Sequence, residues 1–274
     1  MHEAIKGDSS AEGTMIRRRI IQLAAFGIFV GTMSMTRAEE PVPRPAISAE
    51  AAAAIAHMGE TLSAKGLSFT VKTIRVYLDE SGQPLHIFHT MQFVARRPDR
   101  LAVHVAGDDG SHDLFYDGKS TSVFVRDSNE YAAVAAPGDI PSALNDVLDK
   151  LKISLPLVGF FYDSPDQLFL RDTLAGWQVG TAKIDGVECR HLFFSQRAGV
   201  NVELWVEQND GAIPRRLIVT YTLLAGQPNF IAEFANWNSE SRAADSEFVF
   251  QPPADAKRIE LVPARAPGQI GSEQ

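Results

Sequence analysis

Apolar and polar residues alternate with a period of two along much of the chain, as expected for antiparallel strands that bury one face. The alternation runs through residues 67–78 and resumes over residues 85–93, after a polar turn at residues 79–82. Two such stretches, joined by a turn that contains Asp and Gly, predict a long β-hairpin.

Short Asp-Gly turns separate most of the strands that follow. Asp117-Gly118 divides residues 114–116 from 120–124, and Asp185-Gly186 divides residues 177–184 from 187–194. Two-residue loops of this kind favour turns with positive φ, which join neighbouring antiparallel strands. Further strands are predicted at residues 101–105, 202–207, 217–222, 230–237 and 248–250. The strands therefore form a meander, without the crossover helices that a parallel sheet requires.

A helical spacing of three and four residues appears in two places. It predicts a first helix over residues 49–65, with Ser48 as its N-cap, and a helical insertion over residues 141–153, with Pro141 in its first turn. A short third helix is predicted over residues 165–170. The expected fold class is α+β: one large, curled antiparallel sheet of about ten or eleven strands, an incomplete β-barrel, with helices covering its concave face.

The helical insertion supplies the candidate ligand site. Its apolar residues share one face, and an aromatic pair follows them in a strongly apolar segment, so that together they could form a lid over the sheet. These lid residues are Leu144, Val147, Leu148, Leu151, Phe160 and Phe161. A sheet that curls without closing leaves space beneath such a lid, which side chains fill or which remains as a pocket. The sequence leaves both outcomes open.

The N-terminal region has the pattern of an export signal. Arg17-Arg18-Arg19 precedes an apolar run, residues 20–35, which is followed by Thr36-Arg37-Ala38. At about 1.5 Å per residue this run is shorter than the roughly 30 Å hydrocarbon core, so cleavage after about Ala38 is favoured over an uncleaved anchor. Met1 and Met15 both remain possible starts. The expected organisation is a cleaved signal peptide at 1–38, a proline-rich tether at 39–47, a single domain at 48–262 and a disordered tail at 263–274.

Charge and cysteine content restrict the partners of the exported chain. The formal net charge is −8, and removal of residues 1–38 leaves 21 Lys and Arg against 31 Asp and Glu. Such a molecule repels nucleic acids and anionic lipid surfaces. Cys189 is the only cysteine, so an intramolecular disulfide is impossible and the core must hold the fold. The one basic cluster, residues 96–100, is interpreted as a solvated loop between strands.

No pattern in the chain predicts catalysis. The nearby histidines are His86, His89, His104 and His112. His86 and His89 lie three residues apart, so on one strand they point to opposite faces and cannot bind one metal ion together. Cys189 and His191 share a face, and the thiol is interpreted as structural. The chain contains neither Gly-x-Ser-x-Gly nor a P-loop nor a dinucleotide-binding glycine loop. We therefore expect no enzyme activity, metal or cofactor.

Several segments together resemble one known family. They are Arg97-Pro98-Asp99-Arg100-Leu101, Tyr116-Asp117-Gly118-Lys119, Ile184-Asp185-Gly186-Val187, Leu204-Trp205-Val206-Glu207, residues 213–221, residues 227–237 and residues 248–256. Over most of residues 50–262 the chain resembles the predicted periplasmic proteins catalogued as domain of unknown function 2092. That family is similar to the lipoprotein-carrier superfamily of LolA, LolB and LppX type, whose fold is an incomplete antiparallel barrel with helices over an apolar cavity for acyl chains.

The resemblance implies a periplasmic binding or carrier protein. Its partner would be a hydrophobic small molecule, a lipid or a lipoprotein acyl chain held between sheet and helices, and the protein would not span the membrane after signal cleavage. The alternative is an envelope interaction or sensor domain without catalytic activity, in which a protein or peptide binds at an edge of the sheet. The sequence leaves the ligand, the cavity volume and the oligomeric state open.

Overall fold

The computed structural model describes residues 46–136, 138–151 and 156–260 of the chain. All of them belong to one unit, residues 44–274, whereas the predicted signal peptide, most of the tether and the predicted C-terminal tail lie outside the described residues. None of the helices in the described part of the chain is long and apolar enough to cross a membrane.

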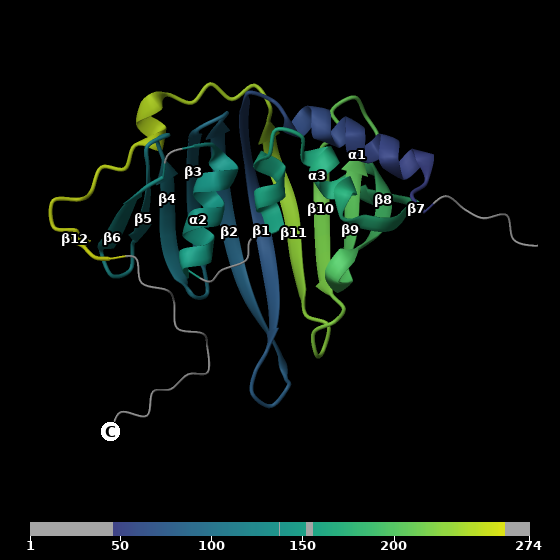
Figure 1. The fold of residues 1–274 in the computed structure, drawn as a ribbon, viewed down its shortest axis with the longest axis horizontal. Helices are drawn as coiled ribbons and strands as arrows, with labels where there is room; N and C mark the ends of the chain where they lie inside the picture. The colour runs from purple at the N-terminus through teal and green to yellow at the C-terminus, as the bar shows by residue number, and fades with distance from the viewer. Residues whose placement is uncertain (1–45, 137, 152–155, 261–274) are drawn as a thin grey trace, which may run out of the picture. The chain divides into compact units, whose positions relative to one another are not determined.

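A twelve-stranded sheet forms the body of the described unit (Figure 1). Its strands are β1 Gly66–Leu78, β2 Pro84–Arg96, β3 Arg100–Gly107, β4 Gly110–Tyr116, β5 Ser120–Val125, β6 Glu130–Ala135, β7 Thr173–Ile184, β8 Val187–Gln196, β9 Val200–Glu207, β10 Pro214–Tyr221, β11 Asn229–Asn238 and β12 Lys257–Arg258. They lie in the order β12-β6-β5-β4-β3-β2-β1-β11-β10-β9-β8-β7, and every pair is antiparallel except β12 with β6. The sheet curls and does not close, so the expected fold class is confirmed.

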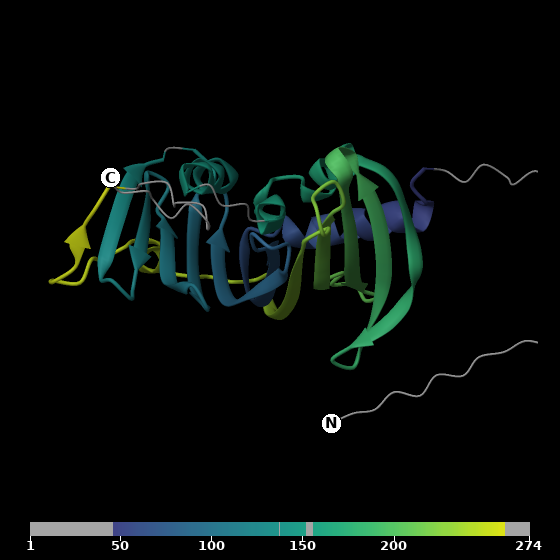
Figure 2. The same ribbon diagram turned by 90° about the horizontal axis from the view of Figure 1, so that it is seen from below.

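One long-range pairing decides this order. β1 pairs with β11, with Val71 opposite Phe234 and Ile74 opposite Ile231, so the first strand lies in the middle of the sheet. The two strands that flank the helical insertion, β6 and β7, consequently lie toward opposite ends of the sheet. The insertion must cross the sheet between them, and Figure 2 shows its helices on one side of the strands. We call this side the covered face and the opposite side the open face.

The helices lie close to their expected positions. They are α1 Ala49–Leu62, α2 Ile140–Leu151 and α3 Pro165–Arg171, with the 3-10 helices η1 Pro156–Phe161, η2 Arg197–Gly199 and η3 Asp245–Phe248. Ser48 caps α1 as predicted, because its hydroxyl accepts a hydrogen bond of 3.2 Å from the Ala51 amide. α1 ends at Leu62, three residues earlier than expected, where the Ser63 hydroxyl donates to the Gly59 carbonyl at 2.8 Å.

Aromatic side chains occupy the middle of the covered face. Phe69 of β1 stacks on Phe93 of β2 with ring centroids 4.8 Å apart, and its ring lies 4.3 Å from that of Trp237 of β11. Phe69 and Phe93 are almost completely buried. The alternation seen in the sequence thus directs the large rings of the central strands into one core.

Two regions differ from the sequence predictions. Residues 248–250 were expected to form a strand, but η3 ends at Phe248, whose buried ring lies under the guanidinium of Arg96. Phe250 then packs on the open face against the rings of Phe115, Phe124 and Tyr131. Aromatic packing therefore replaces strand pairing here. Two unexpected strands, β6 and β12, complete that end of the sheet.

The end of the predicted tether is attached to the sheet. Ile47 forms a parallel bridge with Gly176 of β7, and the Gly176 amide donates to the Ala46 carbonyl at 2.8 Å. The sequence pattern predicted that ordered structure begins at Ser48. The contacts of Ala46 and Ile47 show that it extends at least two residues further toward the N-terminus.

Candidate functional site

The predicted lid residues of α2 face the core. Leu144 and Val147 are buried, and Leu148 is half-buried and packs against the hydrophobic core. Leu151 is the last residue of α2, and its side chain lies outside the described part of the chain. The amphipathic spacing in the sequence thus places the apolar face of α2 against the sheet.

The other two predicted lid residues end η1 and fill the space beneath it. The ring of Phe161 lies 5.7 Å from that of Phe93, and the ring of Phe160 lies 5.5 Å from that of Phe234. Both side chains are less than one tenth exposed. The sequence left open whether the space beneath the lid is filled by side chains or remains as a pocket. Directly below η1 it is filled by side chains.

A hollow remains beside this aromatic core, which we call the end pocket. It lies at the margin of the sheet where β1 and β10 end and β11 begins, and it has a volume of about 520 Å³. It is lined by Arg75, Val76, Tyr77, Leu78, Pro156, Tyr221, Leu224, Ala225, Pro228, Asn229 and Phe230. Pro156 of η1 brings the helical insertion to its wall, and Phe230 connects it to the core. Its size lies within the range of small-molecule sites, and its lining is mostly apolar, as is typical of them.

Few polar groups reach the end pocket. The guanidinium of Arg75 lies over the Phe230 ring, 5.9 Å from its centroid. The Oδ1 atom of Asn229 is buried and accepts no hydrogen bond within the described structure. A buried acceptor without a donor is costly to the stability of the fold.

Arg97 holds the helical insertion in place. Its guanidinium donates to the carbonyl oxygens of Phe161, of Leu62 at 2.9 Å and of Phe160 at 2.8 Å, so it ties the β2–β3 turn to the ends of η1 and α1. Burial lowers the pKa of Arg97, which the charge of Asp163 partly offsets. The interpretation of residues 96–100 as a solvated loop is therefore wrong for Arg97. Nothing local in the sequence marks it, since its partners lie 35 and 63–64 residues away.

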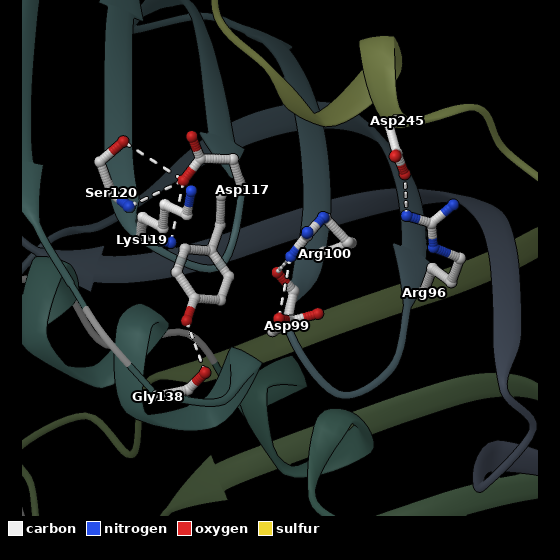
Figure 3. A network of polar contacts seen from close by, with 9 residues as sticks. Arg96, Asp99, Arg100, Asp117, Lys119, Ser120, Gly138 and Asp245 are labelled. Atoms are coloured by element: carbon white, nitrogen blue, oxygen red, sulfur yellow. Dashed lines mark hydrogen bonds and ion pairs between the residues drawn. The ribbon is translucent and has the colours of Figure 1, made fainter.

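The neighbouring polar groups also serve the turns (Figure 3). Arg96 pairs with Asp245 of η3, and Arg100 lies 2.9 Å from the carboxylate of Asp99. The carboxylate of Asp117 accepts the amide hydrogens of Lys119 and Ser120 at 2.9 and 2.8 Å. These contacts stabilise the hairpin turn and η3, and they offer no open group for chemistry.

Three of the histidines form separate pairs, each with one carboxylate. His89 lies 2.7 Å from Asp109, while His104 lies 2.8 Å from Asp113 and His191 lies 2.8 Å from Glu203. Among the described residues, no three His, Cys, Asp or Glu side chains gather where they could hold one metal ion. Cys189 is buried, and burial raises the pKa of its thiol, as does the charge of Glu207.

A second hollow, which we call the groove, lies on the open face and was not foreseen from the sequence. It has a volume of about 650 Å³ and crosses β10, β11, β1, β2 and β3. Ile74, Ile218 and Ile231 form an apolar row, beside which Lys72 lies and Arg216 bonds to Glu233 at 2.6 Å. These charges make the groove a poorer site for an apolar ligand than the end pocket.

Comparison with known proteins identifies a family for the chain. The model of a family described as a predicted periplasmic protein, DUF2092, matches residues 51–262. No curated protein sequence matches the chain. Among solved structures, Mycobacterium tuberculosis lipoprotein LppX is 15% identical, with a TM-score of 0.45, covering 71% of this chain and 99% of that one. A LolA superfamily protein from Nitrosomonas europaea is 11% identical, with a TM-score of 0.36. The match covers 73% of this chain and 97% of that one. A chain of the Pseudomonas aeruginosa MucA/MucB complex is 16% identical, with a TM-score of 0.41, covering 74% and 62%.

Proposed function

The chain belongs to the family of predicted periplasmic proteins, DUF2092, that it matches over residues 51–262; from that premise we propose that it is a periplasmic binding or carrier protein for a hydrophobic ligand. A lipid or a lipoprotein acyl chain is the class of ligand that fits an apolar site. The observation that carries the proposal is the end pocket, a mostly apolar hollow of about 520 Å³ beside the helical insertion.

Burial alone supplies the binding energy in this mechanism. Removal of each CH₂ group from water is worth about 0.8 kcal/mol, so several methylene groups in the end pocket hold an acyl chain without a catalytic or charged residue.

The lid residues act together in this proposal. Leu144, Val147, Leu148, Phe160 and Phe161 anchor α2 and η1 over the sheet, and Leu151 is the sixth lid residue predicted from the sequence. A chain longer than the end pocket enters the core only if the rings of Phe160 and Phe161 move away. The hydrogen bonds of Arg97 to these two residues oppose that movement, and each bond to a charged donor contributes about 1.5–3 kcal/mol. Arg97 therefore sets how far the lid yields to a ligand.

A binding experiment with a fluorescent fatty acid tests the proposal. Delipidated protein is titrated with the probe, and native mass spectrometry determines the stoichiometry. Leu224→Asp places a carboxylate at the wall of the end pocket, and we expect it to weaken binding at least tenfold. Val249→Asp is the matched control, because Val249 is 44% exposed and lies outside the lining. Absence of binding by the delipidated protein, or equal loss in both variants, would refute the site.

A further inference from the structure

β7 forms an open edge of the sheet. It is the last strand in the order and pairs on one side with β8. On its other side, Gly176 donates to the Ala46 carbonyl and accepts from the Ser48 amide, both at 2.8 Å. Within the described part of the chain, no further backbone hydrogen bond forms on this side of β7. We call the stretch from Trp177 to Ile184 the β7 edge.

Exposed apolar side chains gather on this strand. Leu174, Trp177 and Val179 are 50%, 46% and 53% exposed, and these three are among the eight large hydrophobic side chains exposed in the described structure. The Trp177 ring is held against Phe193 of β8, with centroids 4.7 Å apart. Free amide and carbonyl groups beside exposed apolar side chains form a template for another strand.

The chain protects its opposite edge with its own residues. β12 lies parallel to β6, where the Lys257 amide donates to the Asn129 carbonyl at 3.0 Å and the Ile259 amide to the Tyr131 carbonyl at 2.8 Å. At β7 the corresponding segment, Ala46–Ser48, reaches Gly176 alone, because α1 begins at Ala49. β12 is a short strand added at one edge of this sheet, and within the described part of the chain no such strand lies along residues 177–184.

We propose that the β7 edge binds an extended peptide segment of another envelope protein as an added strand. The backbone of the peptide continues the sheet, and apolar side chains at every second position pack on Trp177 and Val179. Backbone hydrogen bonds provide affinity in this mode of recognition, and the side-chain contacts provide selectivity. This role goes beyond ligand binding, since the end pocket belongs to β1, β10, β11 and η1.

The irregularity of β7 favours a peptide over a second copy of the chain. The register of β7 shifts between Thr173 and Ala175 and again between Gln178 and Gly180. Two copies that paired through β7 would have to match two bulged strands, and such bulges are a common protection against edge-to-edge association. A flexible peptide adapts its backbone to one bulged strand.

Peptide selection followed by mapping tests this inference. The folded chain is used to select from a phage-displayed random peptide library, and the enriched peptides are synthesised and titrated. We expect peptides with alternating apolar residues, whose binding slows amide hydrogen exchange in residues 177–184. Val179→Asp should weaken binding about tenfold, and Val249→Asp, the same change at another exposed position, should leave it unchanged.

Three outcomes would overturn the inference: no enrichment of peptides, protection that maps to the groove or the end pocket, or equal binding by Val179→Asp. Dimerisation through β7, detected by light scattering and abolished by Val179→Asp, would assign the edge to a second copy and would also reject a peptide partner. None of these results changes the outcome of the fatty-acid titration. Peptide binding at the β7 edge and ligand binding in the end pocket can therefore be refuted independently.

Discussion

The guanidinium of Arg97 donates a hydrogen bond of 2.8 Å to the carbonyl oxygen of Phe160, across 63 residues of sequence. This bond joins the turn between two central strands to the last residues of η1. With the bonds from Arg97 to Leu62 and Phe161, it fixes the helical insertion against the sheet.

Replacement of Arg97 should therefore be strongly destabilising. We expect Arg97→Met to lower the free energy of unfolding by about 3 kcal/mol, because three carbonyl oxygens lose a charged donor. Urea denaturation measures this change. Arg171→Met is the control, since the Arg171 side chain is 70% exposed and among the described residues its ion pair is with the adjacent Asp172, so its effect should stay below about 1 kcal/mol. Equal effects would contradict the role of Arg97.

Replacement of Asn229 by an apolar residue should raise the free energy of unfolding, the opposite of the effect expected at Arg97. Its Oδ1 atom is buried without a donor in the described structure, so Asn229→Leu removes an unsatisfied acceptor while it keeps the branching at Cγ. We expect the free energy of unfolding to rise by about 1 kcal/mol. A drop in stability would indicate that Oδ1 has a partner in solution.

The hairpin turn at Asp117 should contribute a pH-dependent stability. Burial raises the pKa of this carboxyl, but hydrogen bonds from Ser120 and Lys119 outweigh it, so that the pKa lies below the ordinary value of 3.8. A carboxyl whose pKa is lower in the folded state stabilises the fold above the unfolded pKa, and this contribution is lost as the pH falls through the folded pKa. We expect Asp117→Asn to reduce the loss of stability below about pH 4. Unfolding measured in urea at several pH values would detect the difference, and parallel curves would contradict it.

The thiol of Cys189 should be unreactive in the folded protein. The side chain is buried, and burial raises its pKa, so the reactive thiolate is scarce at neutral pH. We expect a thiol reagent such as iodoacetamide to modify Cys189 only at the rate at which the protein unfolds. Mass spectrometry with and without urea measures that rate. Rapid modification without denaturant would show that the site opens locally.

Local sequence patterns determined much of the fold. The Asp-Gly turns at 117–118 and 185–186 fixed their hairpins, because the turn geometry joins strands that are adjacent in sequence. The Ser48 cap and the apolar spacing placed α1 and α2, since these signals act within one or two helical turns. The same spacing correctly directed Leu144 and Val147 of α2 toward the core.

Tertiary structure decided what depends on residues far apart in sequence. The pairing of Val71 with Phe234 placed β1 in the centre of the sheet, which left β7 as an open edge. Contacts of Phe160 and Phe161 filled the space below η1, so that the hollow lies at the ends of the strands. Alternation and turn signals are local and report which face a residue takes. Pairing, pocket volume and the bonds of Arg97 arise from the packing of distant side chains, and a period along the chain cannot encode them.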